Sequence, residues 1–313
     1  MIRPTFHAVA LAALIAAGST AAHAAPKPGA NALNDVRILS ADDMEGRGIG
    51  TPGGAKARAY IVKRFGQIGL KPQGKTFEQP FTFKPRYFGK DVAGVNLVAR
   101  IQGTSSSDKV LVVSAHYDHL GVRKGEVYNG DDDNASGVAG LLAVAEVFKA
   151  RPPRHTVLIV AFDGEESGLR GAKAFVADPP VPLATIGLNV NFDMIGTSRT
   201  GELYVSGAGP QPWLKPVLDR VAKTAPVKLK QGHDTDADGK HNNWTLQSDQ
   251  GPFAEAGVPW VYFGVEDHPE YHQPNDDFAT VPQDFFKRAV TTVVAATRAL
   301  DNDLDGISKA AGR

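Results

Sequence analysis

The sequence predicts an α/β protein, a three-layer sandwich in which helices cover both faces of a central, mostly parallel (mixed) sheet. Two observations predict it. Short apolar segments of strand length alternate along the chain with helical segments, which is typical of sheets buried on both faces. Histidines and acids follow several of these apolar segments directly, and in such folds functional groups collect at the carboxyl ends of the strands.

The helical spacing of Ile61, Phe65 and Ile68 predicts a helix over 55–70. Three prolines in 71–90 indicate short edge strands or loop, and alternation over 95–101 indicates a half-buried strand. Further strands are expected over 110–115, 156–162, 186–192, 203–206 and 259–263. Further helices are expected over 136–148, 168–176, 212–223, 251–256 and 283–301.

The composition is that of an ordinary globular protein, with 313 residues of which 42% are hydrophobic. Lys+Arg and Asp+Glu both number 34, so the charge balance does not favour nucleic-acid binding. The chain has no cysteine, which excludes disulfides and thiolate chemistry. Any metal must therefore bind to His, Asp and Glu.

The N-terminal residues 1–24 resemble an export signal. Arg3 is followed by an apolar run over 8–17 and by the small-x-small site Ala22-His23-Ala24. This run is shorter than the ~20 residues that span a bilayer. A buried or anchoring helix is the alternative. We expect a periplasmic or secreted protein with a flexible leader over 25–38, one domain over 39–301 and a polar tail over 302–313. No later segment suits a membrane span, and the oligomeric state is not indicated.

Acids and histidines that follow the expected strands predict a metal site. Three consecutive acids, Asp131 to Asp133, repel one another unless a cation lies among them. The other candidates are His116, Asp118, Glu165, Glu166, Asp193 and His272. Imidazole and carboxylate suit zinc and similar divalent metals, and a carboxylate can bridge two of them. A further free carboxylate could take a proton from water.

Plainer interpretations exist for each part of this set. An acidic loop is often a solvated turn, and Asp131 and Asp133 individually are typical turn or helix-cap residues. Glu165 and Glu166 alone suit an exposed pair or a helix start. Their side chains point in opposite directions from an extended chain, so they do not both ligate one metal from a straight strand. His119 is expected to be a surface or supporting residue.

Five motifs occur together in one order: Ser114-Ala115-His116-Tyr117-Asp118, Asp132-Asp133-Asn134-Ala135-Ser136-Gly137, Gly164-Glu165-Glu166-Ser167-Gly168, Asn191-Phe192-Asp193-Met194 and His268 to Asp276. They resemble the exported dinuclear-zinc aminopeptidases of peptidase family M28. Glu45-Gly46-Arg47-Gly48 is similar to the bacterial periplasmic branch of that family. Gln250 departs from the pattern, since relatives often have histidine there.

The resemblance implies a role for each residue. His116 and Asp193 would hold one zinc ion, Glu166 and His272 the other, and Asp132 would bridge them. Glu165 would be the general base, and Tyr271 would stabilise the oxyanion. Asp118 would orient His116.

The implied function is removal of N-terminal amino acids from peptides with a free N-terminus by zinc-activated water. A carboxypeptidase or dipeptidase, a glutaminyl-cyclase-like relative and a non-catalytic metal-binding protein are the alternatives. The preferred N-terminal residue cannot be read from the sequence.

Overall fold

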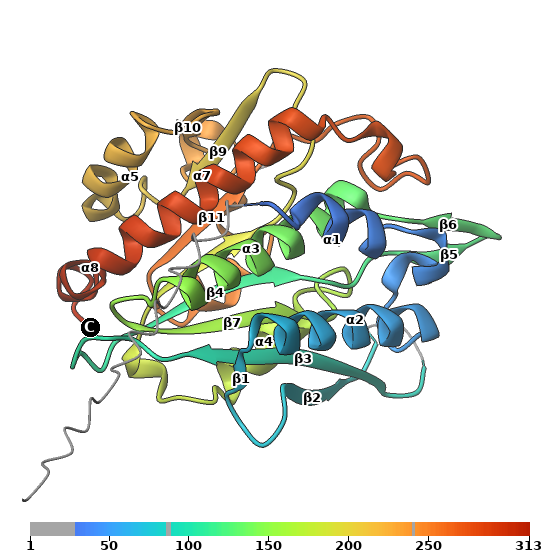
Figure 1. The fold of residues 1–313 in the computed structure, drawn as a ribbon, viewed down its shortest axis with the longest axis horizontal. Helices are drawn as coiled ribbons and strands as arrows, with labels where there is room; N and C mark the ends of the chain where they lie inside the picture. The colour runs from blue at the N-terminus through green and yellow to red at the C-terminus, as the bar shows by residue number, and fades with distance from the viewer. Residues whose placement is uncertain (1–28, 86–88, 240–241) are drawn as a thin grey trace, which may run out of the picture.

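The computed structural model describes residues 29–85, 89–239 and 242–313. Over these residues a mixed sheet of nine strands runs through the molecule (Figure 1). Its order is β1-β3-β7-β4-β8-β11-β9-β10, with β2 paired to β3. The bounds are β1 Lys71–Pro72, β2 Glu78–Phe83, β3 Val92–Ile101, β4 Val110–His116, β7 Thr156–Phe162, β8 Ile186–Phe192, β9 Glu202–Ser206, β10 Lys228–Gln231 and β11 Trp260–Gly264. A separate hairpin joins β5 (Gly121–Arg123) and β6 (Glu126–Tyr128).

The four central strands, in the order β7-β4-β8-β11, are mutually parallel. Antiparallel pairs flank them, β3 with β7 on one side and β9 with β11 on the other. The predicted mostly parallel, mixed sheet is therefore confirmed.

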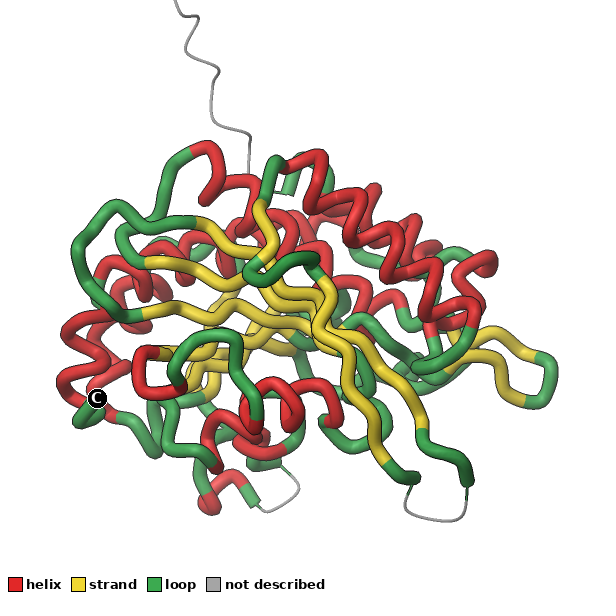
Figure 2. Tube along the Cα trace, turned by 90° about the horizontal axis from the view of Figure 1, so that it is seen from below, coloured by secondary structure: helices red, strands yellow, loops and turns green. Residues whose placement is uncertain are grey.

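Helices cover both faces of the sheet (Figure 2). One face carries α1 (Ala32–Leu39), α2 (Pro52–Ile68), α3 (Gly137–Ala150), α5 (Lys215–Ala222) and α7 (Gln283–Asn302). The other face carries α4 (Arg170–Ala177) and α6 (Gln250–Glu255). The last helix is α8 (Leu304–Ala310). The three-layer arrangement is confirmed as well.

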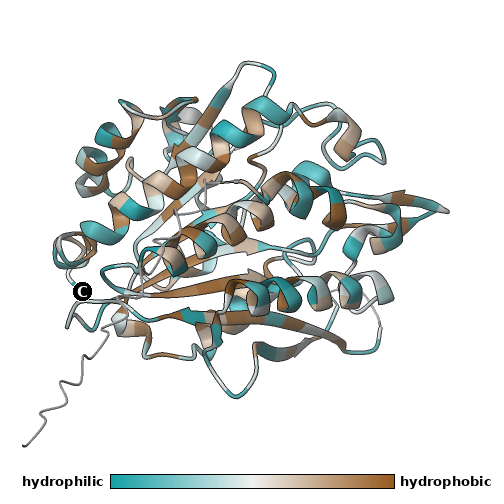
Figure 3. Cartoon of the chain, in the orientation of Figure 1, coloured by the Kyte–Doolittle hydropathy of each residue, from teal (hydrophilic) through white to brown (hydrophobic). Residues whose placement is uncertain are grey.

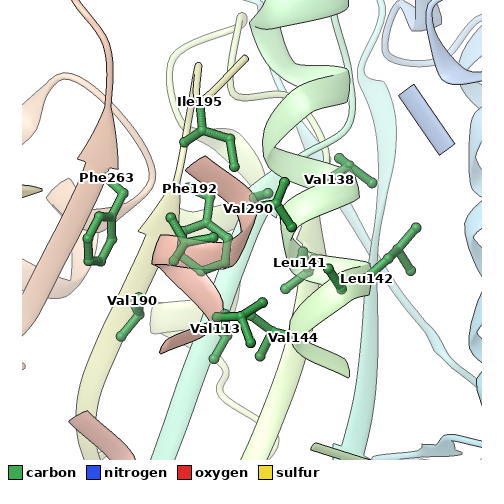
Figure 4. Close-up of a cluster of buried hydrophobic side chains, with 14 of the residues drawn as sticks. Val113, Val138, Leu141, Leu142, Val144, Val190, Phe192, Ile195, Phe263 and Val290 are labelled. Atoms are coloured by element: carbon green, nitrogen blue, oxygen red, sulfur yellow. The ribbon is translucent and has the colours of Figure 1, made fainter. Parts of the chain in front are cut away.

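Two apolar cores hold these layers together. In the larger one, Leu141 and Val144 of α3 pack with Val113 of β4 and Phe192 of β8 (Figure 4). In the smaller one, the rings of Phe162, Phe175 and Phe253 have centroids 5.6–6.3 Å apart. Brown apolar strands lie between helices with teal outer faces in Figure 3. Because β4, β7 and β8 are buried along their whole length, the ends of these strands are held rigidly.

Local signals explain where α2 begins and ends. The Thr51 side chain accepts a hydrogen bond from the Gly54 N–H at 3.2 Å, and Pro52 occupies the first turn. Gly69 ends the helix with a φ of 78°, a conformation that favours glycine.

Two of the expected boundaries were wrong. Residues 32–38, assigned to a flexible leader, lie in α1, where Val36 and Leu39 are buried. The tail over 302–313 contains α8, where Leu304 and Ile307 are buried. Apolar residues spaced three or four apart in these short segments form a buried helical face. The expected export signal, 1–24, lies outside the described residues.

Among the described residues, no helix combines the length and apolar character that a bilayer crossing requires.

Candidate metal centre

The predicted convergence of strand ends is present. His116 ends β4, Glu165 and Glu166 follow β7, and Asp193 follows β8. These three parallel strands are neighbours in the sheet, and β11, next to β8, leads to His272. The turn Asp131–Ser136, just before α3, brings acids to the same place. The sheet thus gathers residues that are far apart in the sequence at one edge.

The ligand-type side chains form two groups that share one residue. His116, Asp133 and Asp193 form the first group, and His119, Asp133 and Glu166 form the second. Within each group the potential ligand atoms lie within 4.8 Å of one another. We call them the His116 group and the His119 group.

Asp133 turns one carboxylate oxygen to each group. Its Oδ1 lies 3.4 Å from His116 Nε2, which is itself 3.1 Å from Asp193 Oδ1. Its Oδ2 lies 3.0 Å from His272 Nε2, and that nitrogen is 3.4 Å from Glu166 Oε1. His272 therefore joins the His119 group, and the shared carboxylate is positioned to bridge two cations.

The bridging position predicted for Asp132 is thus occupied by Asp133. Asp132 points elsewhere: its Oδ1 accepts hydrogen bonds from Gly196 N–H at 2.6 Å and Ser136 Oγ at 3.0 Å. Its Oδ2 lies 3.0 Å from His268 Nε2. In a tight turn, three consecutive side chains point in three directions. The sequence alone therefore does not show which aspartate faces the histidines.

The rest of the turn is anchored by other polar contacts. The Asp131 carboxylate accepts a hydrogen bond from Ser40 Oγ at 2.9 Å. The Asp276 carboxylate accepts the backbone N–H groups of Asp132 and Asp133 at 3.1–3.2 Å. Asp131 is therefore a supporting residue, as expected, whereas Asp133 is not a simple turn residue.

Asp118 holds both the histidine and the glutamate pair. Its backbone carbonyl lies 3.1 Å from His116 Nδ1, and its carboxylate oxygen lies 3.7 Å from the same nitrogen. The carboxylate accepts the N–H groups of Glu165 at 3.0 Å and Glu166 at 3.4 Å. Gly164, with a φ of 75°, makes the turn that allows Glu165 and Glu166 to point differently.

Tyr271 lies beside the ligand groups. Its ring stacks on the His272 ring with centroids 3.9 Å apart. His272 has a φ of 56°, an uncommon conformation for a residue other than glycine. Gln250, where the family pattern has histidine, lies away from these groups: it accepts from Asn191 Nδ2 at 3.1 Å and donates to the Trp244 carbonyl at 2.6 Å.

Two histidines of these groups, His116 and His272, have raised pKa values in the metal-free protein. Burial lowers the pKa of His272, but close contacts with the Asp133 and Glu166 carboxylates outweigh it and raise the pKa to about 10. Burial opposes charge on His116 too, yet Asp193 and its other acidic neighbours raise its pKa well above the ordinary value. The protons occupy places where a divalent cation would be more effective.

The pKa values of Asp133 and Glu165 are shifted in opposite directions, although the two acids lie in the same site. Burial raises the pKa of Asp133, but His119, His116 and His272 outweigh it and hold the pKa well below the ordinary value. Burial, with repulsion from Asp193 and Asp249, raises the pKa of Glu165 well above its ordinary value. Asp133 is thus poised as a ligand and Glu165 as a proton carrier.

These residues fit a pair of divalent metals. The donors are imidazole nitrogens and carboxylate oxygens, which zinc accepts. Within the described part of the chain, His119 Nδ1 and Glu166 Oε1 are buried without a hydrogen-bond partner although they lie 2.8 Å apart. Buried polar atoms left unpaired cost roughly 1–3 kcal/mol each, and a shared cation would remove that cost.

Arg47, which the sequence did not mark as a functional residue, is fully buried. Its guanidinium donates to the carbonyls of Tyr117 at 2.9 Å and Gly130 at 2.8 Å, and also to those of Leu39 and Asn129. These contacts connect the loop after β4 to the turn that carries Asp133. Nothing in the sequence around Arg47 indicates that the side chain points inward.

Comparison with known proteins identifies the class of protein. The model of peptidase family M28 matches residues 96–297, and the chain belongs to this family. All the residues of the two groups lie within that range.

Particular relatives refine the comparison. A "Probable zinc metalloprotease" of Pyrenophora tritici-repentis is 26% identical over 77% of this chain and 60% of its own length. "Aminopeptidase YwaD" of Bacillus subtilis is 30% identical over 60% of this chain and 40% of its own length. The chain spans about half the length of the curated relatives it matches.

Two solved structures share the fold. BSAP, a zinc aminopeptidase from Bacillus subtilis, superposes with a TM-score of 0.69 at 17% identity, covering 88% of this chain and 95% of its own. Porphyromonas gingivalis glutaminyl cyclase also superposes with a TM-score of 0.69 at 17% identity, covering 86% and 97%. At this identity the likeness shows the α/β fold alone.

Proposed function

We propose that this protein is an exopeptidase that binds two zinc ions and removes N-terminal amino acids from peptides. The single observation that carries the proposal is the position of Asp133, with one carboxylate oxygen toward each ligand group. His116 and Asp193 would hold one ion, and Glu166 and His272 the other. Asp133 replaces Asp132 as the proposed bridge.

The zinc ions would supply a water molecule of lowered pKa and would polarise the scissile carbonyl. The chain's own groups do the rest. Glu165, whose raised pKa suits a group that takes and returns a proton, receives the proton of the water and delivers it to the leaving amine. Tyr271 would donate its phenol hydrogen to the developing oxyanion. Asp118 fixes Glu165 through the backbone N–H, which keeps the base in place.

Preference for a free N-terminus is supported by the names of the aminopeptidase relatives and by the acids of the site. A protonated amine would be attracted to unligated carboxylates near the metals. A cavity of about 330 Å³ beside His268 has room for a small side chain and is lined partly by Arg199, Glu202 and Tyr204. A larger cavity, about 800 Å³, lies between Gly209 and Glu255 and includes none of the proposed ligands.

The fold also suits a glutaminyl cyclase, since one such enzyme superposes on it. A cyclase would release ammonia from a peptide with N-terminal glutamine and leave the peptide chain intact, so an assay with such a peptide separates the two functions. Carboxypeptidase action would need a substrate carboxylate in place of the free amine, and dipeptidase action would need both groups. A non-catalytic metal-binding protein would hold the same ions without turnover.

The test is hydrolysis of leucyl 4-nitroanilide and of its N-acetylated form, before and after chelation. An aminopeptidase hydrolyses only the substrate whose amine is free. Its activity is lost when the metal is removed and returns when zinc is added back. Cleavage of the acetylated form, or activity that survives complete metal removal, would contradict the proposal. A panel of other amino-acid anilides would define the preferred N-terminal residue.

We also propose that the protein is exported and acts in the periplasm or outside the cell. The basis is the signal pattern of residues 1–24. N-terminal sequencing of the protein from the envelope fraction should begin at Ala25. A cytoplasmic protein that retains Met1 would overturn this proposal.

A further inference from the structure

His119 lies three residues after His116, in the loop that follows β4, and its side chain is fully buried. Its Nδ1 is 2.8 Å from Glu166 Oε1 and 3.6 Å from Asp133 Oδ2. Over the described residues, neither ring nitrogen has a hydrogen-bond partner, because the short contact with Glu166 lacks the alignment of a hydrogen bond. The ring thus faces two carboxylates without donating to either.

An ordinary buried histidine is held differently. His155 is equally buried, and its Nδ1 contacts the Asp301 backbone carbonyl at 2.8 Å and the Asp301 carboxylate at 3.2 Å. Its Nε2 lies 3.1 Å from Asp305 Oδ1 without an aligned hydrogen bond, so one nitrogen of this ring is held, whereas neither nitrogen of His119 is. Histidines that serve the fold are held by partners of this kind. In contrast, His119 Nδ1 and Glu166 Oε1 point toward the same place, as two ligands of one cation do.

The chain leaves room for this ring. Gly130 packs against it: a Cβ at that position would lie 2.5 Å from His119 Cγ and Cδ2 and would also clash with the Asp133 carbonyl oxygen. Gly130 also has a φ of 55°, which favours glycine. A larger residue would push the ring away from Glu166 and shift the turn that carries Asp133.

His119 and His272 approach the same carboxylates from two loops. Their ring centroids are 5.8 Å apart, with planes inclined at 53°. His272 Nε2 contacts Asp133 Oδ2 and Glu166 Oε1, and His119 Nδ1 faces the same two oxygens.

We propose that His119 is an additional protein ligand of the metal held by Asp133, Glu166 and His272. This inference rests on the proposed dinuclear function. The His119 group then offers four protein donors, against three in the His116 group. The two sites are therefore unequal: the metal of the His119 group is held more tightly, and the metal of the His116 group exchanges first.

The experiment compares metal-free wild type with His119→Ala and with His155→Gln, a buried histidine outside the site. Each is titrated with zinc against a chromophoric chelator, and separately with Co²⁺ while the visible absorption is recorded. Wild type should bind two ions with unequal dissociation constants. Loss of a supporting residue near a metal costs 10–100-fold in affinity, so loss of a ligand should raise the tighter constant by at least ~100-fold.

The Co²⁺ spectrum at one equivalent should change in His119→Ala and stay unchanged in His155→Gln. If wild type binds two ions and His119→Ala has the same two dissociation constants and the same Co²⁺ spectrum, His119 is not a ligand. That result would overturn this inference but not the dinuclear function. Wild type that binds fewer than two ions would overturn the dinuclear function and the inference together. If His119→Ala does not fold, as judged by circular dichroism of the metal-free protein, His119→Gln fills a similar volume, and the same criteria apply to it.

Discussion

Two buried clusters of acids differ in how their charge is neutralised. Between α1, α2 and α3, Arg64 lies 2.7 Å from Asp35 and 2.5 Å from Glu146, so a protein cation balances both carboxylates. At the strand ends, the Asp133 and Glu166 side chains contact imidazoles, and Glu166 Oε1 has no hydrogen-bond partner among the described residues. The carboxylate charges of the first cluster are balanced without a ligand, whereas a bound cation would balance those of the second.

Arg47 and Arg64 are both buried, but they contact different kinds of partner. Arg64 pairs with carboxylates, whereas Arg47 donates to four backbone carbonyls next to the metal-site loops. Arg64 therefore stabilises the packing of helices, and Arg47 fixes the positions of loops.

The largest expected effect on activity comes from replacing Glu165, the proposed general base. Glu165→Gln keeps the size of the side chain but removes its ability to carry a proton. We expect turnover of a leucyl anilide to fall roughly 10²–10⁴-fold, the usual contribution of a general base, while two zinc ions remain bound. Steady-state kinetics with metal analysis checks this. Unchanged turnover with full metal content would remove Glu165 from the mechanism.

Arg64→Met should damage the first cluster alone. Removal of one partner from a buried ion pair costs roughly 3–5 kcal/mol, because the remaining charges stay buried. We expect the free energy of unfolding to fall by about that amount, with metal affinity unchanged. Denaturant unfolding and zinc titration measure the two quantities. A large loss of zinc affinity would show that the two clusters are coupled.

Arg47→Met is the matched change beside the metal site. It leaves the carbonyls of Tyr117 and Gly130 without their donor, so the turn that carries Asp133 loses an anchor. We expect zinc affinity to fall about 10–100-fold, as for other residues that orient ligands. The comparison with Arg64→Met controls for loss of a buried arginine. Equal zinc affinities in the two variants would contradict the positioning role of Arg47.

Alkaline pH should destabilise the metal-free protein. The pKa values of His268 and His272 are raised to about 9 and about 10, because close contacts with acids outweigh burial. The stability they contribute is fully present below their ordinary value of 6.5 and is lost as pH rises through those values. Burial raises the pKa of Asp249 from 3.8 to about 8, so the folded protein also loses stability as pH rises between these two values.

With His272 as a zinc ligand, zinc would replace its proton. The gap in Tm between zinc-loaded and chelated protein should then widen from about pH 6 to pH 9. Thermal melts across this range measure the gap. A gap that stays constant with pH would contradict the assignment of His272 as a ligand.

Much of the fold could be predicted, because the buried strands are continuous apolar runs and their order sets a parallel sheet. The two short helices near the ends of the chain were not predicted, since α1 has only eight residues and α8 only seven, too few turns for a clear helical period before packing. The hairpin β5–β6 and strand β10 are short and mostly polar, and they carry equally weak patterns.

The convergence of His116, Glu166, Asp193 and His272 was predictable because each follows an apolar strand, whereas their assignment as ligands came from the resemblance to family M28. The choice among Asp131, Asp132 and Asp133 was not, since it depends on the backbone of one turn and on Asp276, far along the chain. The inward position of His119 depends on Gly130 in another loop. Such contacts between distant segments leave no local pattern in the sequence.

The most direct measurement is the zinc content of the purified protein and of two neighbouring variants, Asp133→Asn and Asp132→Asn, by elemental analysis after dialysis. The two-cation site predicts two zinc ions per chain in the wild type, fewer than one in Asp133→Asn, and close to two in Asp132→Asn. Two zinc ions retained in Asp133→Asn, or a wild type that holds none, would contradict it.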